Sequence, residues 1–262
     1  MISVLLFLQH SLRHGVPIQT ALFPRMQYDP NCFYWSDGAI RSRSVGATVL
    51  FGAVDIPTPP SRLVADWERE ILVHLNLEPG DVHELPLARA RARWPDYRRC
   101  VQAATDWTCT LGLPGLLATS DVALMACRGA RYHHDSAQYG GMAFCNLFLS
   151  EDKGLDLHFP DTGLRIALSR GMAVVFDTGQ PHAVIRRDAQ SFDTADFPAD
   201  LDCSLAFLTW ELPVEDSYVA KLLHISFGTT LPTSSPLEGG SIWRHGTPAT
   251  VCPQSGQWRS AG

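Results

Sequence analysis

Three side chains in this sequence have the types and the spacing of a metal site: His133, Asp135 and, much later in the chain, His182. In an extended strand the side chains at positions i and i+2 point to the same face, so His133 and Asp135 can reach one point. Two imidazoles and one carboxylate on adjacent corners of an octahedron are the ligand set of non-haem Fe(II) centres, which leave the opposite corners open. The three residues are therefore a candidate iron site.

The pair formed by His133 and Asp135 is a weak signal alone, because the chain has ten histidines and such a pair arises easily by chance. Its context strengthens the hypothesis. The pair ends a predicted strand, and the apolar run 171–176, followed by a tight turn, leads to His182. A later strand can therefore deliver the third ligand.

Three residues of similar chemistry are expected to lie elsewhere. Asp156 and His158 are an alternative pair of carboxylate and imidazole ligands. However, they alternate with apolar residues that should occupy the buried face of the same strand, so both should face outward. His134 is out of phase with its neighbours and should face away from the metal, in a structural or supporting role.

The chain from residue 121 onward has the pattern of an all-β barrel or sandwich, because short apolar runs are separated by turns. We predict strands at 122–127, 142–149, 155–159, 164–168, 172–176, 182–186 and 204–212. They would close into two facing sheets. The expected core is therefore a double-stranded β-helix, or jelly roll.

The rest of the chain is expected to flank this core, which gives a mainly β fold with added helices (α+β). Apolar residues recur at helical spacing in 61–77 and 96–111, and these helices would buttress one sheet from outside. Between them, alternating arginines form either a solvated basic face or a patch for an acidic partner. The expected regions are an N-terminal helical and mixed region (1–120), a metal-binding jelly-roll core (121–212) and a C-terminal helix with a loop-rich tail (213–262), together one structural domain.

The composition fits a globular protein with a sizeable core: 262 residues, 45% of them hydrophobic, with a formal net charge of -6. This charge argues against a general nucleic-acid or anionic-membrane binder. No stretch reaches the ~18 apolar residues of a membrane span, and the apolar run 4–8 indicates a buried strand or helix edge, not a signal peptide. The seven cysteines include no Cys-x-x-Cys pair, which favours reduced thiols. We expect a cytoplasmic protein without a membrane or nucleic-acid partner.

Several short motifs between residues 122 and 212 point together to one family. They are Ala123-Leu124-Met125-Ala126-Cys127, Tyr132-His133-His134-Asp135, Gly154-Leu155-Asp156-Leu157, Gly171 to Phe176, Pro181-His182-Ala183-Val184 and Leu208-Thr209-Trp210. With them, this third of the chain resembles the core of the Fe(II)/2-oxoglutarate-dependent dioxygenase superfamily, and looks most like its prolyl 4-hydroxylase type. The resemblance implies that His133, Asp135 and His182 hold Fe(II), that 2-oxoglutarate and O₂ are co-substrates, and that the chain hydroxylates a small-molecule or peptide substrate.

One part of the family pattern is missing. The prolyl hydroxylase type carries a basic residue on its closing strand, which pairs with the far carboxylate of 2-oxoglutarate. Here the closing strand 204–212 has no Lys or Arg, and 188–202 indicates an acidic loop insertion. A dicarboxylate without a cationic partner is poorly held in a dry pocket. Either another arginine replaces the missing one, or 2-oxoglutarate is not the co-substrate.

Arg186 is the best substitute, because it follows His182 by four positions in the same predicted strand and so projects to the same face. Arg165 and Arg131 are the next candidates. The family resemblance also suggests, more weakly, that Asn146 and Tyr139 donate a hydrogen bond to an oxygen of the ligand.

Two other functions stay open at this point. A cupin-like enzyme could use the same iron with another co-substrate, as the missing basic residue would favour. A binding or sensing module could keep the fold without catalysis.

Overall fold

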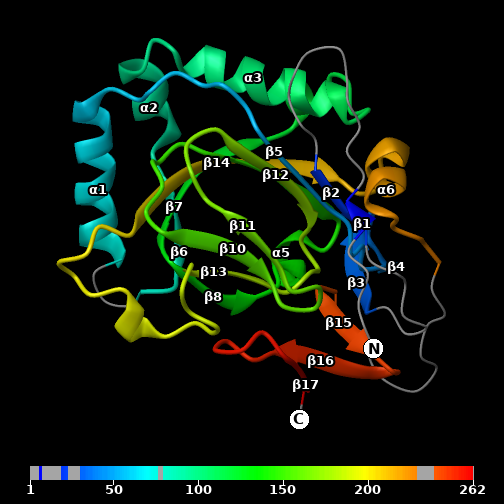
Figure 1. Ribbon diagram of the computed structural model, residues 1–262. Coiled ribbons are helices and arrows are strands. Elements are labelled where there is room, and N and C mark those ends of the chain that lie inside the picture. The colour runs from blue at the N-terminus through cyan, green and yellow to red at the C-terminus, as the bar shows by residue number, and fades with distance from the viewer. Residues whose placement is uncertain (1–5, 8–18, 23–29, 76–78, 229–238, 262) are drawn as a thin grey trace.

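The computed structural model describes residues 6–7, 19–22, 30–75, 79–228 and 239–261. Its centre is a pair of antiparallel sheets that pack against each other (Figure 1). The larger sheet contains, in spatial order, β12 (Met172–Asp177), β9 (Met142–Phe148), β14 (Ser204–Pro213) and β7 (Val122–Arg128). The smaller sheet contains β11 (Leu164–Ala167), β10 (Leu155–Phe159), β13 (His182–Arg186) and β8 (Ala130–His133).

The order of these strands is that of a double-stranded β-helix. From β7 to β14 the chain changes sheets at every step except between β10 and β11. The predicted jelly-roll core is therefore confirmed. The sequence does not separate β7 from β8. In the structure Gly129 turns the chain between them with a φ of 71°, and a Cβ at this position would collide with the ring of Phe197.

Strand β12 shows why part of the core is apolar at every position. Val174 and Phe176 pack between the two sheets, whereas Ala173 and Val175 face the helices outside the larger sheet. Both faces of the strand are covered, so the usual alternation of apolar and polar residues is absent. The strand ends at Asp177, where the turn to His182 begins.

Three helices pack on the larger sheet: α1 (Ser61–Leu75), α2 (Leu87–Arg93) and α3 (Tyr97–Thr110). The predicted helices at 61–77 and 96–111 are confirmed by α1 and α3, although residues 76–78 lie outside the described part of the chain. The sequence does not predict α2, which carries the alternating arginines. Arg89 and Arg93 on α2 form ion pairs with Glu70 and Asp66 of α1. None of the described helices is long and apolar enough to cross a membrane.

Further strands extend the larger sheet at both edges. Beyond β12 lie β5 (Val49–Ala53), β2 (Gln19–Leu22) and β1 (Leu6–Phe7), and beyond β7 lies β6 (Val82–Leu85). Of the apolar run 4–8, only the two residues of β1 are described. Short helical segments complete the described fold: α4 (Leu116–Thr119), α5 (Ser136–Tyr139), η1 (Thr194–Asp196) and α6 (Ser217–Leu223).

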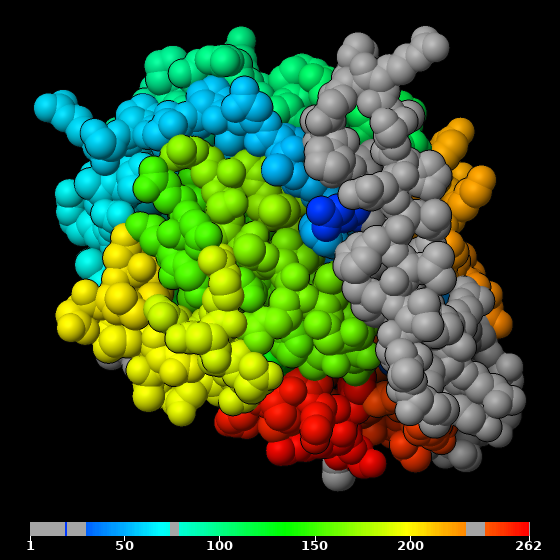
Figure 2. All heavy atoms as spheres, viewed as in Figure 1, coloured from blue at the N-terminus to red at the C-terminus, as the bar shows by residue number. Residues whose placement is uncertain are grey.

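A third sheet joins the two ends of the chain. Its order is β17 (Trp258–Ser260), β16 (Thr247–Val251), β15 (Ser241–Arg244), β3 (Asn31–Ser36) and β4 (Ala39–Ser44). The sequence predicts a loop-rich tail here, but the pairing of β15 with β3 gives this segment partners that no local pattern reveals. Figure 2 shows the C-terminal residues, in red, at the lower side of the molecule. This segment contacts β8, since the backbone N–H of Tyr132 donates to the carbonyl of Pro253.

Candidate metal centre

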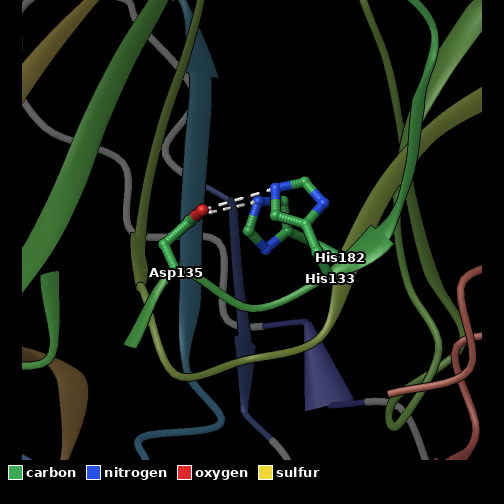
Figure 3. Close-up of side chains that lie close together, drawn as sticks. All are labelled: His133, Asp135 and His182. Carbon is green, nitrogen blue, oxygen red and sulfur yellow. Dashed lines mark ion pairs between the residues drawn. The ribbon is translucent and has the colours of Figure 1, made fainter. Parts of the chain in front are cut away.

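The structure brings His133, Asp135 and His182 together at one end of the barrel (Figure 3). His133 ends β8 and His182 begins β13, and the two residues are direct partners in the antiparallel pairing of these strands. The Nε2 atom of His133 lies 3.4 Å from Oδ1 of Asp135, and Nε2 of His182 lies 3.5 Å from Oδ2. One ligand atom from each residue falls within 4.8 Å of the others. Among the described residues this is the one cluster of at least three such groups that could hold a metal ion.

Both histidines have the tautomer that a metal ligand needs. Nδ1 of His133 lies 2.6 Å from the carbonyl oxygen of Arg131, and Nδ1 of His182 lies 3.0 Å from that of Gln180. A carbonyl oxygen only accepts hydrogen bonds, so each Nδ1 carries the proton and donates it. The lone pair of each Nε2 is then free and directed toward Asp135, as in metal sites where a carbonyl orients the imidazole.

The carboxylate of Asp135 is also left available. Asp135 precedes α5, a position where an aspartate usually accepts a hydrogen bond from the first amides of the helix. Here its side chain makes no such bond. Instead its backbone fixes it: its N–H donates to the carbonyl of Thr178, and its carbonyl accepts from the N–H of Tyr139. The side chain is thus held toward the histidines rather than used to cap the helix.

The electrostatic surroundings keep His182 neutral. Burial lowers its pKa to about 4, and the neighbouring His133 ring contributes in the same direction. The rings of Phe176 and Phe159 lie 4.9 and 6.1 Å away, centroid to centroid, and exclude water from this side of the site. A neutral imidazole is the form that binds a metal ion.

A buried ion pair holds the two loops that carry these ligands. Nη1 and Nη2 of Arg43 donate to Oδ2 and Oδ1 of Asp177 at 2.6 and 2.8 Å, and both side chains are fully buried. Nε of Arg43 donates to the carbonyl of Gly140, which directly follows α5. Asp177 begins the turn that leads to His182. One arginine from β4 therefore links the segment after Asp135 to the segment before His182.

A cavity of about 230 Å³ opens beside the three ligands, between the two sheets. Most of its wall is apolar. The polar side chains in the wall, apart from the three ligands, are those of Gln138, Tyr139, Asn146, Thr209 and Glu211.

Asn146 and Thr209 face each other across β9 and β14, as direct partners in the strand pairing. Oδ1 of Asn146 and Oγ1 of Thr209 are buried without a hydrogen-bond partner. Such orphaned buried groups are costly unless a ligand or water bonds them. Burial also raises the pKa of Glu211, and the charge of Asp121 adds to this effect. The wall therefore offers neutral hydrogen-bonding groups and an acidic one.

The predicted co-substrate residues divide into two groups. Asn146 and Tyr139 line the cavity, whereas Arg186, Arg165 and Arg131 do not. The described lining residues include no Lys or Arg at all. The role proposed for Arg186 thus has no support from its position, because four residues along β13 separate it from the metal end by about 13 Å.

Each of these arginines has partners of its own. Arg165 donates from all three guanidinium nitrogens, to Asp156 and to the carbonyls of Ala189 and Arg186. Nη1 of Arg131 donates to Asp81, and Nε of Arg186 lies 3.5 Å from Oδ1 of Asp188. Their charges are largely compensated outside the cavity.

The competing residues lie away from the metal centre, as predicted. Asp156 is on the outer side of β10, where it forms ion pairs with Arg165 and Arg187, and Nδ1 of His158 lies 2.5 Å from the hydroxyl of Tyr132. His134 turns toward the C-terminal sheet. Its ring stacks on Trp258, and its Nδ1 lies 2.8 Å from the hydroxyl of Ser136.

Sequence reasoning missed Gln138, Thr209 and Glu211 in the cavity wall. The alternation of Phe207, Thr209 and Glu211 along β14 was the available signal, since side chains two residues apart share a face.

Neither a family model nor a curated protein matches the sequence. Solved structures do. One is EvdO2 from Micromonospora carbonacea var. aurantiaca, with 14% sequence identity over 64% of this chain and 87% of that chain, and a TM-score of 0.35. Another is the epimerase SnoN in complex with Fe³⁺, α-ketoglutarate and nogalamycin RO, with 13% identity over 72% of this chain and 89% of that chain, and a TM-score of 0.34. A viral collagen prolyl hydroxylase from Paramecium Bursaria Chlorella virus-1, solved with 2-oxoglutarate, is also similar, with 9% identity over 56% of this chain and 89% of that chain, and a TM-score of 0.31. Each of these structures is similar to more than half of this chain.

Proposed function

We propose that this chain is a non-haem Fe(II) oxygenase that uses 2-oxoglutarate as co-substrate and hydroxylates a small molecule or peptide. One observation carries the proposal: two imidazole Nε2 atoms and one carboxylate converge beside a cavity, and within the described part of the chain no hydrogen bond from another residue occupies their lone pairs. This donor set fits a mononuclear iron with open coordination positions. When bound, the iron would couple the oxidation of a 2-oxo acid and one C–H bond to the reduction of O₂, giving a shortened acid, CO₂ and an alcohol.

The contribution of the chain is to orient the ligands and to keep the site dry. The carbonyls of Arg131 and Gln180 fix the two imidazole rings, and the backbone contacts of Thr178 fix Asp135. Aromatic and aliphatic side chains form most of the cavity wall. A substrate placed there would meet the metal in a rigid, water-poor pocket, which is what oriented bond cleavage requires.

The fit to 2-oxoglutarate is less complete than the fit to iron. Asn146 and Tyr139 can donate to a ligand oxygen, but the described cavity wall contains no cation for a second carboxylate. This observation favours a second candidate, an iron enzyme on the same fold that does not use 2-oxoglutarate.

The test is turnover of 2-oxoglutarate by the Fe(II)-loaded full chain, measured as succinate formation together with O₂ consumption. We expect both in the wild type and neither in His133→Ala, with His83→Ala, which changes an exposed histidine, as the matched control. Succinate formation that persists in His133→Ala would disprove the proposed ligand. O₂ consumption without 2-oxoglutarate would select the second candidate.

A further inference from the structure

The cavity beside the metal centre is unusual in its charge. Apart from the three proposed metal ligands, the one carboxyl group among its described lining residues is that of Glu211. The described lining includes no Lys or Arg. A ligand that brought a second carboxylate into this space would leave it desolvated, without a cationic partner and near the carboxyl group of Glu211.

Three arginines on the strands of the barrel, outside the cavity lining, are bonded to other groups. Arg128 at the end of β7 is buried, and its Nη2 donates to the carbonyls of Phe197 and Pro198. Arg165 has hydrogen bonds from all three guanidinium nitrogens, and Arg186 is paired with Asp188. Moving any of them into the cavity would break these contacts and require a new path through the packed wall.

The rest of the cavity wall suits an apolar group. Side chains from both sheets meet there, and the rings of Phe148 and Phe207 pack at 5.1 Å, centroid to centroid. The aliphatic and aromatic members of the wall include Val82, Met125, Phe148, Leu157, Val184 and Phe207. An apolar side chain placed among them loses contact with water and gains dispersion contacts.

Asn146 and Thr209 add a neutral polar point to this apolar wall. Both side chains are more than nine-tenths buried, and Oδ1 of Asn146 and Oγ1 of Thr209 have no partner. A ligand hydroxyl could donate to Oδ1 of Asn146, and a ligand hydroxyl or carbonyl oxygen could accept from Oγ1 of Thr209. Neither residue can neutralise a carboxylate.

We infer that the cavity selects a metal-chelating 2-oxo acid whose side chain is uncharged and mainly apolar, in preference to the dicarboxylate 2-oxoglutarate. The inference rests on the proposed function, because the 2-oxo acid is taken to bind the metal held by His133, Asp135 and His182. It ranks the 2-oxo acids that the site can bind: 2-oxoglutarate can still chelate the metal through the head that both acids share, but it binds more weakly, and the metal centre and the class of reaction stay as proposed. The metal would bind the 2-oxo acid head of the ligand, and the apolar wall, with the neutral polar pair Asn146 and Thr209, would contact its side chain.

The test compares two acids with the same chelating head. The full chain is loaded with Ni(II), which binds such sites and does not turn over, and is titrated by calorimetry with 2-oxoglutarate and with 4-methyl-2-oxopentanoate. The second acid has a branched alkyl group where the first has a carboxylate. We expect 4-methyl-2-oxopentanoate to bind at least about tenfold more tightly, equivalent to ~1.4 kcal/mol.

The outcomes separate the inference from the proposed function. If 2-oxoglutarate binds as tightly or more tightly, the inference is overturned and the proposed function stands. If neither acid binds the Ni(II)-loaded chain better than the metal-free chain, the use of a 2-oxo acid is itself refuted. The wild-type comparison does not depend on the folding of any variant.

A cation placed inside the cavity and one placed outside it test the cause of the selectivity. Thr209→Arg places a cation in the wall opposite Asn146 and should reverse the preference, so that 2-oxoglutarate binds more tightly than 4-methyl-2-oxopentanoate. His83→Arg adds a cation at an exposed position of β6 outside the cavity wall and should keep the wild-type preference. Phe207→Lys provides a second site for the cation. If neither Thr209→Arg nor Phe207→Lys shifts the ratio of the two affinities, the missing cation is not the cause and the inference fails.

Discussion

Removal of Arg43 should loosen the metal centre although this residue touches none of the proposed ligands. Its guanidinium bonds both carboxylate oxygens of Asp177 at 2.6 and 2.8 Å and the carbonyl of Gly140 at 2.8 Å. The turn that starts at Asp177 supplies two groups to the site: the Thr178 carbonyl, which accepts from the N–H of Asp135, and the Gln180 carbonyl, which orients His182. Arg43 thus fixes both segments at once.

The expected size of the effect follows from the burial of the pair. Removing one partner of a fully buried ion pair typically costs about 3–5 kcal/mol, because the other charge is left uncompensated. In Arg43→Met the Asp177 carboxylate still accepts from the backbone N–H groups of Gly46 and Gly179. We therefore place the loss in unfolding free energy near the lower end, at about 3 kcal/mol. In the double variant Arg43→Met/Asp177→Asn no charge remains buried, so its loss should be smaller than the sum of the two single losses.

The assay is urea unfolding followed by circular dichroism, with Ni(II) affinity measured by calorimetry in the absence of urea. Arg41→Met is the matched control, since Arg41 lies on the same strand but is half exposed and pairs with Asp37 and Glu215 at the surface; it should cost less than about 1 kcal/mol. Metal affinity should fall by about 10–100-fold in Arg43→Met, as for other groups that orient metal ligands. A cost below that of the control, or an unchanged Ni(II) affinity, would refute the reasoning.

Three further predictions concern other parts of the molecule. Burial, with a smaller contribution from Arg165, lowers the pKa of His158 below its ordinary value of 6.5. The unfolded chain therefore takes up a proton first, and the unfolding free energy should fall as the pH drops below about 6.5. This fall, measured by urea unfolding at several pH values, should be smaller in His158→Asn, and an equal slope in the variant would contradict the assignment. Burial raises the pKa of Cys127 and Cys145 to about 12 while Cys109 is exposed, so brief alkylation of the native chain should label Cys109 and spare the other two by mass spectrometry. Gly171 has a φ of 85° and approaches the carbonyl of Val54, so Gly171→Ala should lower the unfolding free energy by at least about 1 kcal/mol in urea; a neutral result would show that the turn before β12 adapts.

The proposed metal ligands could be predicted from sequence because they lie at or beside the ends of strands. The i, i+2 rule assumed a strand through Asp135, whereas β8 ends at His133 and Asp135 directly precedes α5, so the closeness of the pair comes from the turn between them. The apolar run 171–176 with its turn placed His182 at the start of a strand. The antiparallel pairing of His133 with His182 then follows from the strand order of a jelly roll. The alternation on β10 likewise sent Asp156 and His158 to the outer face.

Features that depend on distant residues could not be predicted in this way. Arg43 and Asp177 are 134 positions apart, and neither has a local pattern that indicates a buried pair. The strands of the C-terminal segment exist because β15 pairs with β3 from the other end of the chain. Arg186 shows a different limit. The same-face rule ignores the distance along the strand, so the sequence predicted Arg186 beside the metal, whereas it lies outside the cavity lining and pairs with Asp188.

The measurement that tests the central claim most directly is an anaerobic Fe(II) titration of the full chain. The variants His133→Ala and His182→Ala are compared with His83→Ala, the exposed control. The geometry predicts one equivalent of Fe(II) bound per chain in the wild type and in His83→Ala, and its loss in both ligand variants, with the fold retained by circular dichroism. A wild-type chain that binds no Fe(II), or a ligand variant that binds it as tightly as the wild type, would contradict the assignment of the metal centre.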